Sequence, residues 1–356
     1  MRAVFLESVT TFFYFLLAGT SMRFFTFLLL FCLAYTTNAQ NSLDLTINGV
    51  GLSIGDSEEV TGIRLNYRDR AMRRVTGINA TIWTPYNNFG GDVHGLALGL
   101  PLTGADNLYG VGYGILGVGA NKNLEGVAFG GLGAGAGRDV IGIAVGGLGV
   151  GAGRDVQGIA MGGLGAGAGR HFKGIAIGGL GVGAGSDAVG LLMGGLGAGA
   201  GRDVKGIVIA GIGAGAGRDI VGLAIGGIGA GAGRNFTGIS FSGIATGAGG
   251  TLKGLHMAGI AVGASTVRGI MLSGLTAGGM DVHALSIAPA YFTVPPGGEM
   301  RGLSISSFNR IQGEQKGITI GIVNYARHLS GYQIGLINIA DNKERFRIMP
   351  IFNHSR

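Results

Sequence analysis

Glycine and apolar positions recur along this chain with a period of sixteen residues. In the unit that begins at Gly142, Ile143 and Val145 lie two positions apart, as do Leu148, Val150 and Ala152. A spacing of two is typical of β-strands. The period is marked by glycines at positions 110, 126, 142, 158, 174, 190, 206, 222, 238 and 254. The pattern therefore predicts two short strands in every unit.

Glycine content decides against the other regular structures. Each unit holds six glycines in sixteen residues, which would cost a helix about 5 kcal/mol relative to alanine. A polyproline bundle needs glycine at every third position. The double glycine at 146–147 shifts the apolar phase by one residue and predicts a bend, and Arg154-Asp155 marks a second one.

Two strands and two corners in each unit predict an all-β, glycine-rich β-solenoid. About eighteen coils of 14 to 18 residues would cover positions 49–346 of one repeat domain, residues 40–356, with strict 16-residue repeats over 110–253. We expect a thin core in which large side chains such as Ile175, Ile177 and Met193 face small ones such as Ala198 and Ala200. Stacked β-hairpins and a β-barrel are the alternative architectures.

The N-terminal segment predicts export. Met22-Arg23 supplies a positive charge, residues 24–35 an apolar run, and residues 37–39 small residues before Gln40, so residues 22–39 read as a signal peptide. The run is shorter than the roughly 20 residues of a membrane span. Residues 1–21 are then interpreted as an extra extension upstream of the true start at Met22. Location in the periplasm, at the outer-membrane surface or outside the cell follows, and the only cysteine, Cys32, would be removed with the signal.

Composition changes this picture little. The chain has 77 glycines, 47% hydrophobic and 13% charged residues, and its Ile, Val and Leu recur in fixed phase, which is unlike a disordered chain. A net charge of +7 comes without a dense Lys/Arg run or interleaved aromatic residues. Nucleic acid is therefore not an expected partner.

Charged residues form ladders at the second corner. We expect a solvated edge of mutually compensating charges. Calcium is the alternative ligand of such an edge, but an arginine abuts each aspartate, so neither a metal nor a cofactor is predicted. The ladders consist of Arg138, Arg154, Arg170, Arg202, Arg218 and Arg234, and of Asp139, Asp155, Asp187, Asp203 and Asp219.

Two further groups of residues are candidates for binding a partner. A basic row just before the anchor glycines would suit acidic polysaccharide or lipid headgroups, and a solubilising rim is the alternative. Two 18-residue units, 77–94 and 284–301, hold aromatic residues that could protrude, unless wider coils only need larger core residues. The candidates are Lys253, Arg268, Arg301 and Lys316 in the row, and Trp83, Tyr86, Phe89, Tyr291 and Phe292 in the long units.

No catalytic constellation stands out. The six histidines show no close pairing with each other or with carboxylates, and the glycine motifs sit in no strand–loop–helix unit. The sequence therefore predicts a non-enzymatic structural or interaction protein, a rigid rod of the cell envelope. An outer-membrane β-barrel or a glycan-binding surface protein is the alternative. Membrane association is compatible with each of these, and envelope polysaccharide or another surface protein would be the partner.

The last units carry a family resemblance. Residues 317–326, GITIGIVNYA, and 331–340, GYQIGLINIA, resemble the units of uncharacterised bacterial surface-repeat proteins. The resemblance covers these units closely and the glycine-rich centre only loosely, and it implies an exported, envelope-associated protein. Charged residues crowd both ends of the array, as terminal repeats that act as caps require.

Overall fold

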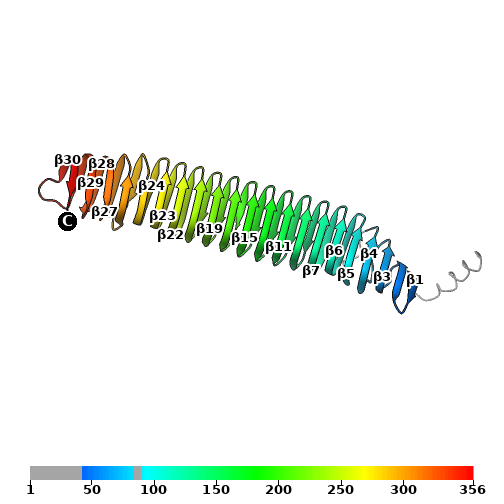
Figure 1. Cartoon of the computed structure of the whole chain (residues 1–356). Helices are drawn as coiled ribbons and strands as arrows, with labels where there is room; N and C mark the ends of the chain where they lie inside the picture. Colours follow the sequence, from blue (N-terminus) through cyan, green and yellow to red (C-terminus); the bar gives the residue numbers. More distant parts are fainter. Residues whose placement is uncertain (1–41, 84–89, 356) are drawn as a thin grey trace, which may run out of the picture.

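The computed structural model describes residues 42–83 and 90–355 of the chain. These residues form an all-β solenoid without helices, with 74% of residues in strands and about 17 turns (Figure 1). The solenoid is thus confirmed among the three architectures expected, with one turn fewer than the estimate. The predicted signal peptide, residues 22–39, and the upstream extension, residues 1–21, lie outside the described residues. The part described holds no helix with the length and apolarity needed to cross a membrane.

Each central coil consists of one long and one short strand. The long strands form one wall, and the short Gly-Xaa-Gly-Ala strands form the other. The long strands are β9 (Asp139–Gly146), β11 (Val156–Gly162), β13 (Phe172–Gly178), β15 (Ala188–Gly194), β17 (Val204–Ala210), β19 (Asp219–Gly226) and β21 (Asn235–Ser242). The short strands are β8 (Gly133–Ala136), β10 (Gly149–Ala152), β12 (Gly165–Ala168), β14 (Gly181–Ala184), β16 (Gly197–Ala200), β18 (Gly213–Ala216) and β20 (Gly229–Ala232).

Successive coils pair in parallel and in strict register. Ile143 of β9 lies beside Ile159 of β11, which lies beside Ile175 of β13. Hydrogen bonds continue around the corner, where the Leu148 amide donates to the Leu132 carbonyl at 2.7 Å. Parallel pairing of neighbouring coils rules out the stacked-hairpin alternative. Chain bends at 147–148 and 153–154 confirm both predicted corners to within one residue.

Strands of more variable length, from 4 to 14 residues, form the two ends of the rod. The N-terminal strands are β1 (Ser42–Ile47), β2 (Val50–Gly55), β3 (Glu59–Asn66), β4 (Arg74–Thr81), β5 (Asp92–Gly99), β6 (Leu102–Gly114) and β7 (Gly117–Gly130). The C-terminal strands are β22 (Ala245–Ala258), β23 (Ala261–Ser273), β24 (Thr276–Ile287), β25 (Tyr291–Val294), β26 (Glu299–Ile305), β27 (Phe308–Gln315), β28 (Ile318–Leu329), β29 (Tyr332–Ala340) and β30 (Ile348–His354).

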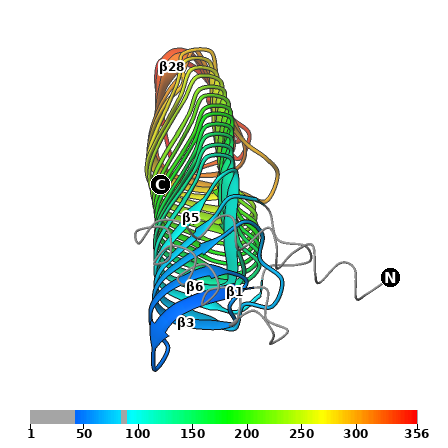
Figure 2. The same cartoon turned by 90° about the vertical axis from the view of Figure 1, so that its right-hand side faces the viewer.

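Both ends are closed by strands that run against the others. β1 pairs with β2, and β30 with β29, in antiparallel fashion, whereas the other pairings are parallel. Seen toward one end of the rod, the coils lie behind one another as flattened loops (Figure 2). An antiparallel end strand interrupts the parallel template that an incoming coil would need, which is compatible with the caps predicted for both ends.

The anchor glycines mark a backbone conformation that other residues rarely adopt. Gly142, Gly158 and Gly174 have φ angles of 121°, 126° and 132°. A Cβ atom on Gly174 would lie 2.0 Å from the carbonyl oxygen of Gly158 in the preceding coil. The sixteen-residue period of this glycine is therefore a requirement of the coil itself.

The core lies between the two walls, and its composition corrects the predicted packing. Inward positions of the long strands hold one larger and one smaller residue, as in Phe172 with Ala176 and Ala188 with Leu192, and all four are buried. Ala198 is buried as expected. The predicted large wall of Ile175, Ile177 and Met193 was wrong, because strand alternation directs these side chains outward, where Ile175 and Met193 are each 37% exposed.

In the C-terminal coils a polar ladder replaces part of the alanine core. Buried Asn309 donates to the Asn324 side-chain oxygen at 2.8 Å, and Asn324 donates to Asn338 at the same distance. Asn324 and Asn338 are the asparagines of the two segments that carry the family resemblance. Each amide satisfies the next, which is how polar groups are tolerated inside a narrow core.

Candidate interaction surfaces

The most extensive surface feature is an apolar sheet face on the outside of the long strands. Two columns of outward side chains form it, one at the register of Ile143 and one at the register of Val145, and none of their members is buried. We call these two columns the apolar face. The first column runs Ile63, Ile78, Leu96, Val111, Val127, Ile143, Ile159, Ile175, Leu191, Ile207, Leu223, Ile239, Leu255, Ile270, Leu285, Leu303 and Ile318. The second runs Leu65, Ala80, Leu98, Tyr113, Phe129, Val145, Met161, Ile177, Met193, Ile209, Ile225, Phe241, Met257, Leu272, Ile287, Ile305 and Ile320.

A third apolar column follows the adjoining corner. Leu148, Leu164 and Leu180 are each about half exposed, at 49%, 49% and 50%. Between this corner column and the apolar face the chain has the double glycine, which leaves a shallow groove. One stretch of the groove is lined by Phe241 and Met257 above Gly243 and Gly259. Bulky ridges around a glycine floor make this side of the rod apolar but not flat.

The short strands present a very different outer side. Their outward positions are glycines, such as Gly149 and Gly181. A Cβ atom added to these two residues would lie 3.6 Å and 3.7 Å from the backbone of the next coil, which is an ordinary van der Waals contact. In other coils the same register holds Ala245 and Tyr291. At Gly149 and Gly181 the backbone therefore does not require glycine, in contrast to the anchor position.

The charged corner is a ladder of ion pairs between coils. Five of the six arginines, all but Arg138, reach the aspartate of the preceding coil. The Nε–Oδ1 distances are 3.0 Å for Arg170–Asp155, 3.1 Å for Arg202–Asp187 and 2.9 Å for Arg218–Asp203. The Asp219 amide also donates to Asp203 at 3.3 Å. Stacked aspartates are thus compensated by both an arginine and a backbone N–H, which confirms the expected edge of balanced charges.

These contacts change the acidity of the aspartates. The hydrogen bond from Arg202 is the main reason why the pKa of Asp187 lies below its ordinary value, and Arg218 has the same effect on the pKa of Asp203. These carboxylates therefore stay charged to a lower pH than an unpaired aspartate does. Because the arginines are exposed, each pair contributes little to stability.

The basic row lies where the sequence placed it, along one edge of the apolar face. Lys253 and Arg268 occupy successive coils, and Arg268 is followed by His283 and then Arg301. Glu299 interrupts the positive charge, because Arg301 bonds to it and Lys316 reaches it at 3.2 Å. The Arg301 hydrogen bond is the main cause of the lowered pKa of Glu299.

The aromatic candidates are not brought together. Trp83 is 47% exposed at the last described position before the gap at 84–89, and Tyr86 and Phe89 lie outside the described residues. Tyr291 is half-buried and packs against Phe308 with ring centroids 5.6 Å apart. Phe292 is fully buried, since the alternation of β25 points it into the core, so its assignment to partner binding was wrong.

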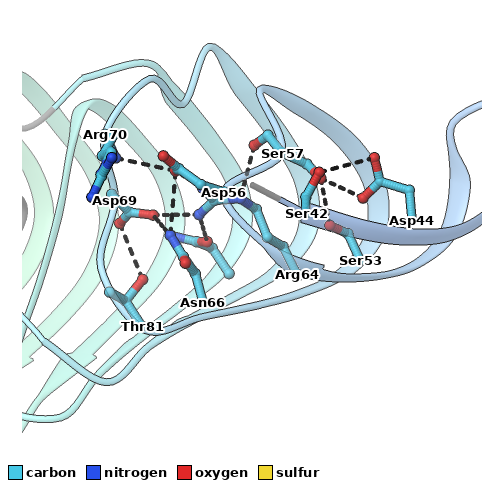
Figure 3. A network of polar contacts seen from close by, with 11 residues as sticks. Ser42, Asp44, Ser53, Asp56, Ser57, Arg64, Asn66, Asp69, Arg70 and Thr81 are labelled. Carbon is cyan, nitrogen blue, oxygen red and sulfur yellow. Dashed lines mark hydrogen bonds and ion pairs between the residues drawn. The ribbon is translucent and has the colours of Figure 1, made fainter. Parts of the chain in front are cut away.

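A buried polar network joins the first coils (Figure 3). The fully buried Arg64 side chain donates to Asp56, to Asn79 and to the Ser57 carbonyl, each at 2.9 Å, and also bonds Asp69. Asp56 and Asp69 belong to the charged residues at the N-terminal end of the array that were expected to form a cap. The network occupies an inward register where the strict coils have alanine. Arg64 finds acceptors on four residues, whereas the Asn79 Nδ2 group is buried without a partner. We assign the network to anchoring the N-terminal cap.

A second polar group lies inside the core near the C-terminal end of β22. His256 is fully buried, accepts or donates at Nδ1 with the Ser240 hydroxyl at 2.9 Å, and packs edge-on against Phe236. Burial lowers its pKa to about 4, which keeps the imidazole neutral at pH 7. No opening leads to it among the described grooves, and it belongs to the core.

Within residues 42–83 and 90–355 no three His, Cys, Asp or Glu side chains are grouped so that they could hold a metal ion. Sequence reasoning missed the apolar face, although the alternation of large and small apolar residues on the long strands was its signal. No family model, curated protein or solved structure matches the chain.

Proposed function

We propose that this protein is an exported, non-enzymatic structural or interaction protein of the bacterial cell envelope, which acts as a rigid rod with one adhesive side. The observation that carries the proposal is the apolar face, which continues over the coils from Ile63 to Ile320. Soluble monomers rarely expose contiguous apolar patches beyond a few hundred Å². A face of this length therefore argues for a working surface that is covered by a partner.

Rigidity supports the same proposal. The described strands belong to one sheet, and the core is continuous from coil to coil. The two antiparallel caps restrict growth at the ends, which leaves the long sides for association. Export is proposed from residues 22–39, whose charged start, apolar run and small-residue end have the form of a signal peptide.

The first test concerns location. In a bacterium that produces the protein, mass spectrometry of the mature chain should give Gln40 as the first residue, and cell fractionation should find the chain outside the cytoplasm. A mature chain that starts at Met1 or Met22 and remains in the cytoplasm would refute the envelope role.

The second test asks whether the function in the envelope depends on the apolar face. A strain without the protein should show an envelope defect, measured as sensitivity to detergent, and the unaltered gene should correct it. An Ile175→Lys/Ile207→Lys chain should not correct it, because two charges interrupt the apolar face. The matched control, Gly181→Lys/Gly213→Lys, adds the same charges to the opposite side and should behave as wild type. Full correction by the first variant would contradict the proposal.

Glycan binding is the second candidate, because Lys253 and Arg268 present positive charge on successive coils. A glycan array with the purified protein tests it. Binding to acidic polysaccharides that is lost in Lys253→Gln/Arg268→Gln would favour this candidate, and a blank array would leave the structural role.

A further inference from the structure

We propose that the apolar face is covered by the apolar face of a second copy of this chain, with the two rods antiparallel. The inference deepens the proposed function, since it names the partner of that face. It is based on three features of the described residues: the area of the face, the spacing of its side chains, and the uneven charge along its edge.

The area suits a stable dimer. Sixteen steps of about 4.8 Å from the first coil to the last give a length of roughly 77 Å. The outward positions from the basic row to the Val145 column span four residue steps, or about 13 Å. Each copy therefore offers roughly 1,000 Å², and a dimer would bury about 2,000 Å² in total, at the upper end of a standard protein interface.

The spacing favours a second solenoid over a helical partner. The ridges of the apolar face repeat once per coil, every 4.8 Å or so, whereas an α-helix repeats every 5.4 Å. The difference of about 0.6 Å per step puts a helix half a step out of phase after roughly four coils. A partner whose ridges have the same spacing stays in phase along the whole rod. A second copy has this spacing because it is built from the same coils.

The charge along the edge favours antiparallel rods. The positive charge of the basic row is concentrated in its C-terminal coils, because the same register in the first coils holds Thr61, Thr76, His94, Tyr109 and Glu125. If the two-fold axis ran along the rods, the two rods would be parallel. The basic row of one copy would then face the corner column of leucines of the other copy. That arrangement would remove lysine and arginine from water without a counter-charge.

A two-fold axis parallel to the strands reduces this cost. This axis passes through the central coil, which contains Val189. A coil near the N-terminal end of one copy then faces the coil at the same distance from the C-terminal end of the other copy. Glu125 then faces Lys253 of the other copy, and Tyr109 faces Arg268, which pairs a carboxylate with an ammonium and a ring with a guanidinium. Among the coils of the row only Lys173 and Lys205 meet as like charges.

The first test measures the mass of the purified protein by sedimentation equilibrium at micromolar concentration. The wild-type chain should be a dimer. Ile175→Lys/Ile207→Lys should weaken dimerisation at least 100-fold, while Gly181→Lys/Gly213→Lys should remain dimeric. Far-ultraviolet circular dichroism must show that both variants are folded. A folded wild-type monomer, or a dimer that is indifferent to the first variant, would overturn the proposal.

The second test reads the orientation. Glu125→Lys should weaken the dimer at least tenfold, and Lys253→Glu in the same chain should restore it. In a Cys32→Ser background, a mixture of E125C and K253C chains should form a disulfide-linked dimer, whereas E125C with K316C should not. Cross-linking of E125C to K316C, or no rescue by the charge swap, would refute the antiparallel register.

A lipid surface is the competing occupant. If the wild-type chain is a monomer that binds phosphatidylglycerol vesicles, and Ile175→Lys/Ile207→Lys abolishes this binding, the face is a membrane surface and the dimer is wrong. The proposed rod function would survive that result. Conversely, a dimer that stays in the cytoplasm would sustain this inference and refute the envelope role.

Discussion

Two glycines only seven positions apart should respond to alanine in opposite ways. Gly174 has a φ of 132°, and a Cβ added to it would lie 2.0 Å from the Gly158 carbonyl oxygen. Gly181 has no such φ, and its added Cβ would meet the Gly197 carbonyl oxygen at an ordinary 3.7 Å. We expect Gly174→Ala to destabilise the rod and Gly181→Ala to be tolerated.

The magnitudes follow from the local geometry. A non-glycine residue in such a backbone conformation costs on the order of 1–3 kcal/mol. Relief of the clash also displaces the Gly158 carbonyl from its place in the parallel ladder, which costs roughly 1 kcal/mol more for the weakened hydrogen bond. The total for Gly174→Ala is about 2–4 kcal/mol. Gly181→Ala should stabilise by up to about 1 kcal/mol, because alanine has fewer conformations in the unfolded chain.

Equilibrium unfolding in guanidinium chloride, followed by far-ultraviolet circular dichroism, measures both changes. The two variants should be compared with wild type at the same protein concentration, since association also contributes to stability. If Gly174→Ala unfolds within about 0.5 kcal/mol of wild type, or if Gly181→Ala is equally destabilising, the distinction between required and optional glycines is wrong.

Five further substitutions test the core, the apolar face, the charged ladder and the cap. Phe172→Ala should lower the free energy of unfolding by about 3–5 kcal/mol, because Phe172 is fully buried. Ile175→Gln in dilute, monomeric protein should lower it by less than about 1 kcal/mol. Denaturant unfolding measures both changes, and equal losses would contradict the assignment of the two faces. Because the pKa of His256 is lowered from 6.5 to about 4, its neutral form stabilises the fold above pH 6.5, and up to ~3 kcal/mol should be lost as pH falls from 6.5 to 4. His256→Met, which copies Met271 of the next coil, should remove that slope in a melting-temperature profile, and an unchanged slope would exclude His256 as its source. Arg202→Gln should raise the pKa of Asp187 toward its ordinary value in an NMR titration while changing stability by less than about 1 kcal/mol; an unchanged titration would show that the ion pair does not form in solution. Arg64→Met should cost about 3–5 kcal/mol, since it leaves Asp56 and Asp69 buried without their counter-charge, and hydrogen exchange should accelerate first in β2 to β4; uniform exchange along the rod would contradict a role confined to the cap.

The sequence allowed much of the coil to be predicted before any coordinates. Glycine at every sixteenth position fixed the unit, and the double glycine and Arg154-Asp155 located its corners, because backbone conformation at these positions depends mainly on local residues. The row from Lys253 to Lys316 was predicted to share one edge, since equal positions in successive units must lie in one register.

The candidate site was predicted less well. Alternation places Ile143 and Val145 on one side of a strand and Ala144 on the other, but both sides are apolar, so the pattern does not say which one faces the core. Which of the two sides faces the core depends on the distance between the two walls. The structure directs Val140 and Ala144 inward, where they are buried, and leaves Ile143 and Val145 on the surface. The apolar face is the result of that choice.

The sequence by itself determined the repeat, the strand and corner positions, and the registers that share an edge, because these depend on local backbone preference and on exact periodicity. Only the tertiary structure decided which side of each strand is buried, that Arg64 lies inside with Asp56 and Asp69, and that Arg170 pairs with Asp155 of the coil before it. Those features depend on contacts between residues at least five and often fifteen positions apart, whose spacing is set by the stacking of coils and the width of the core.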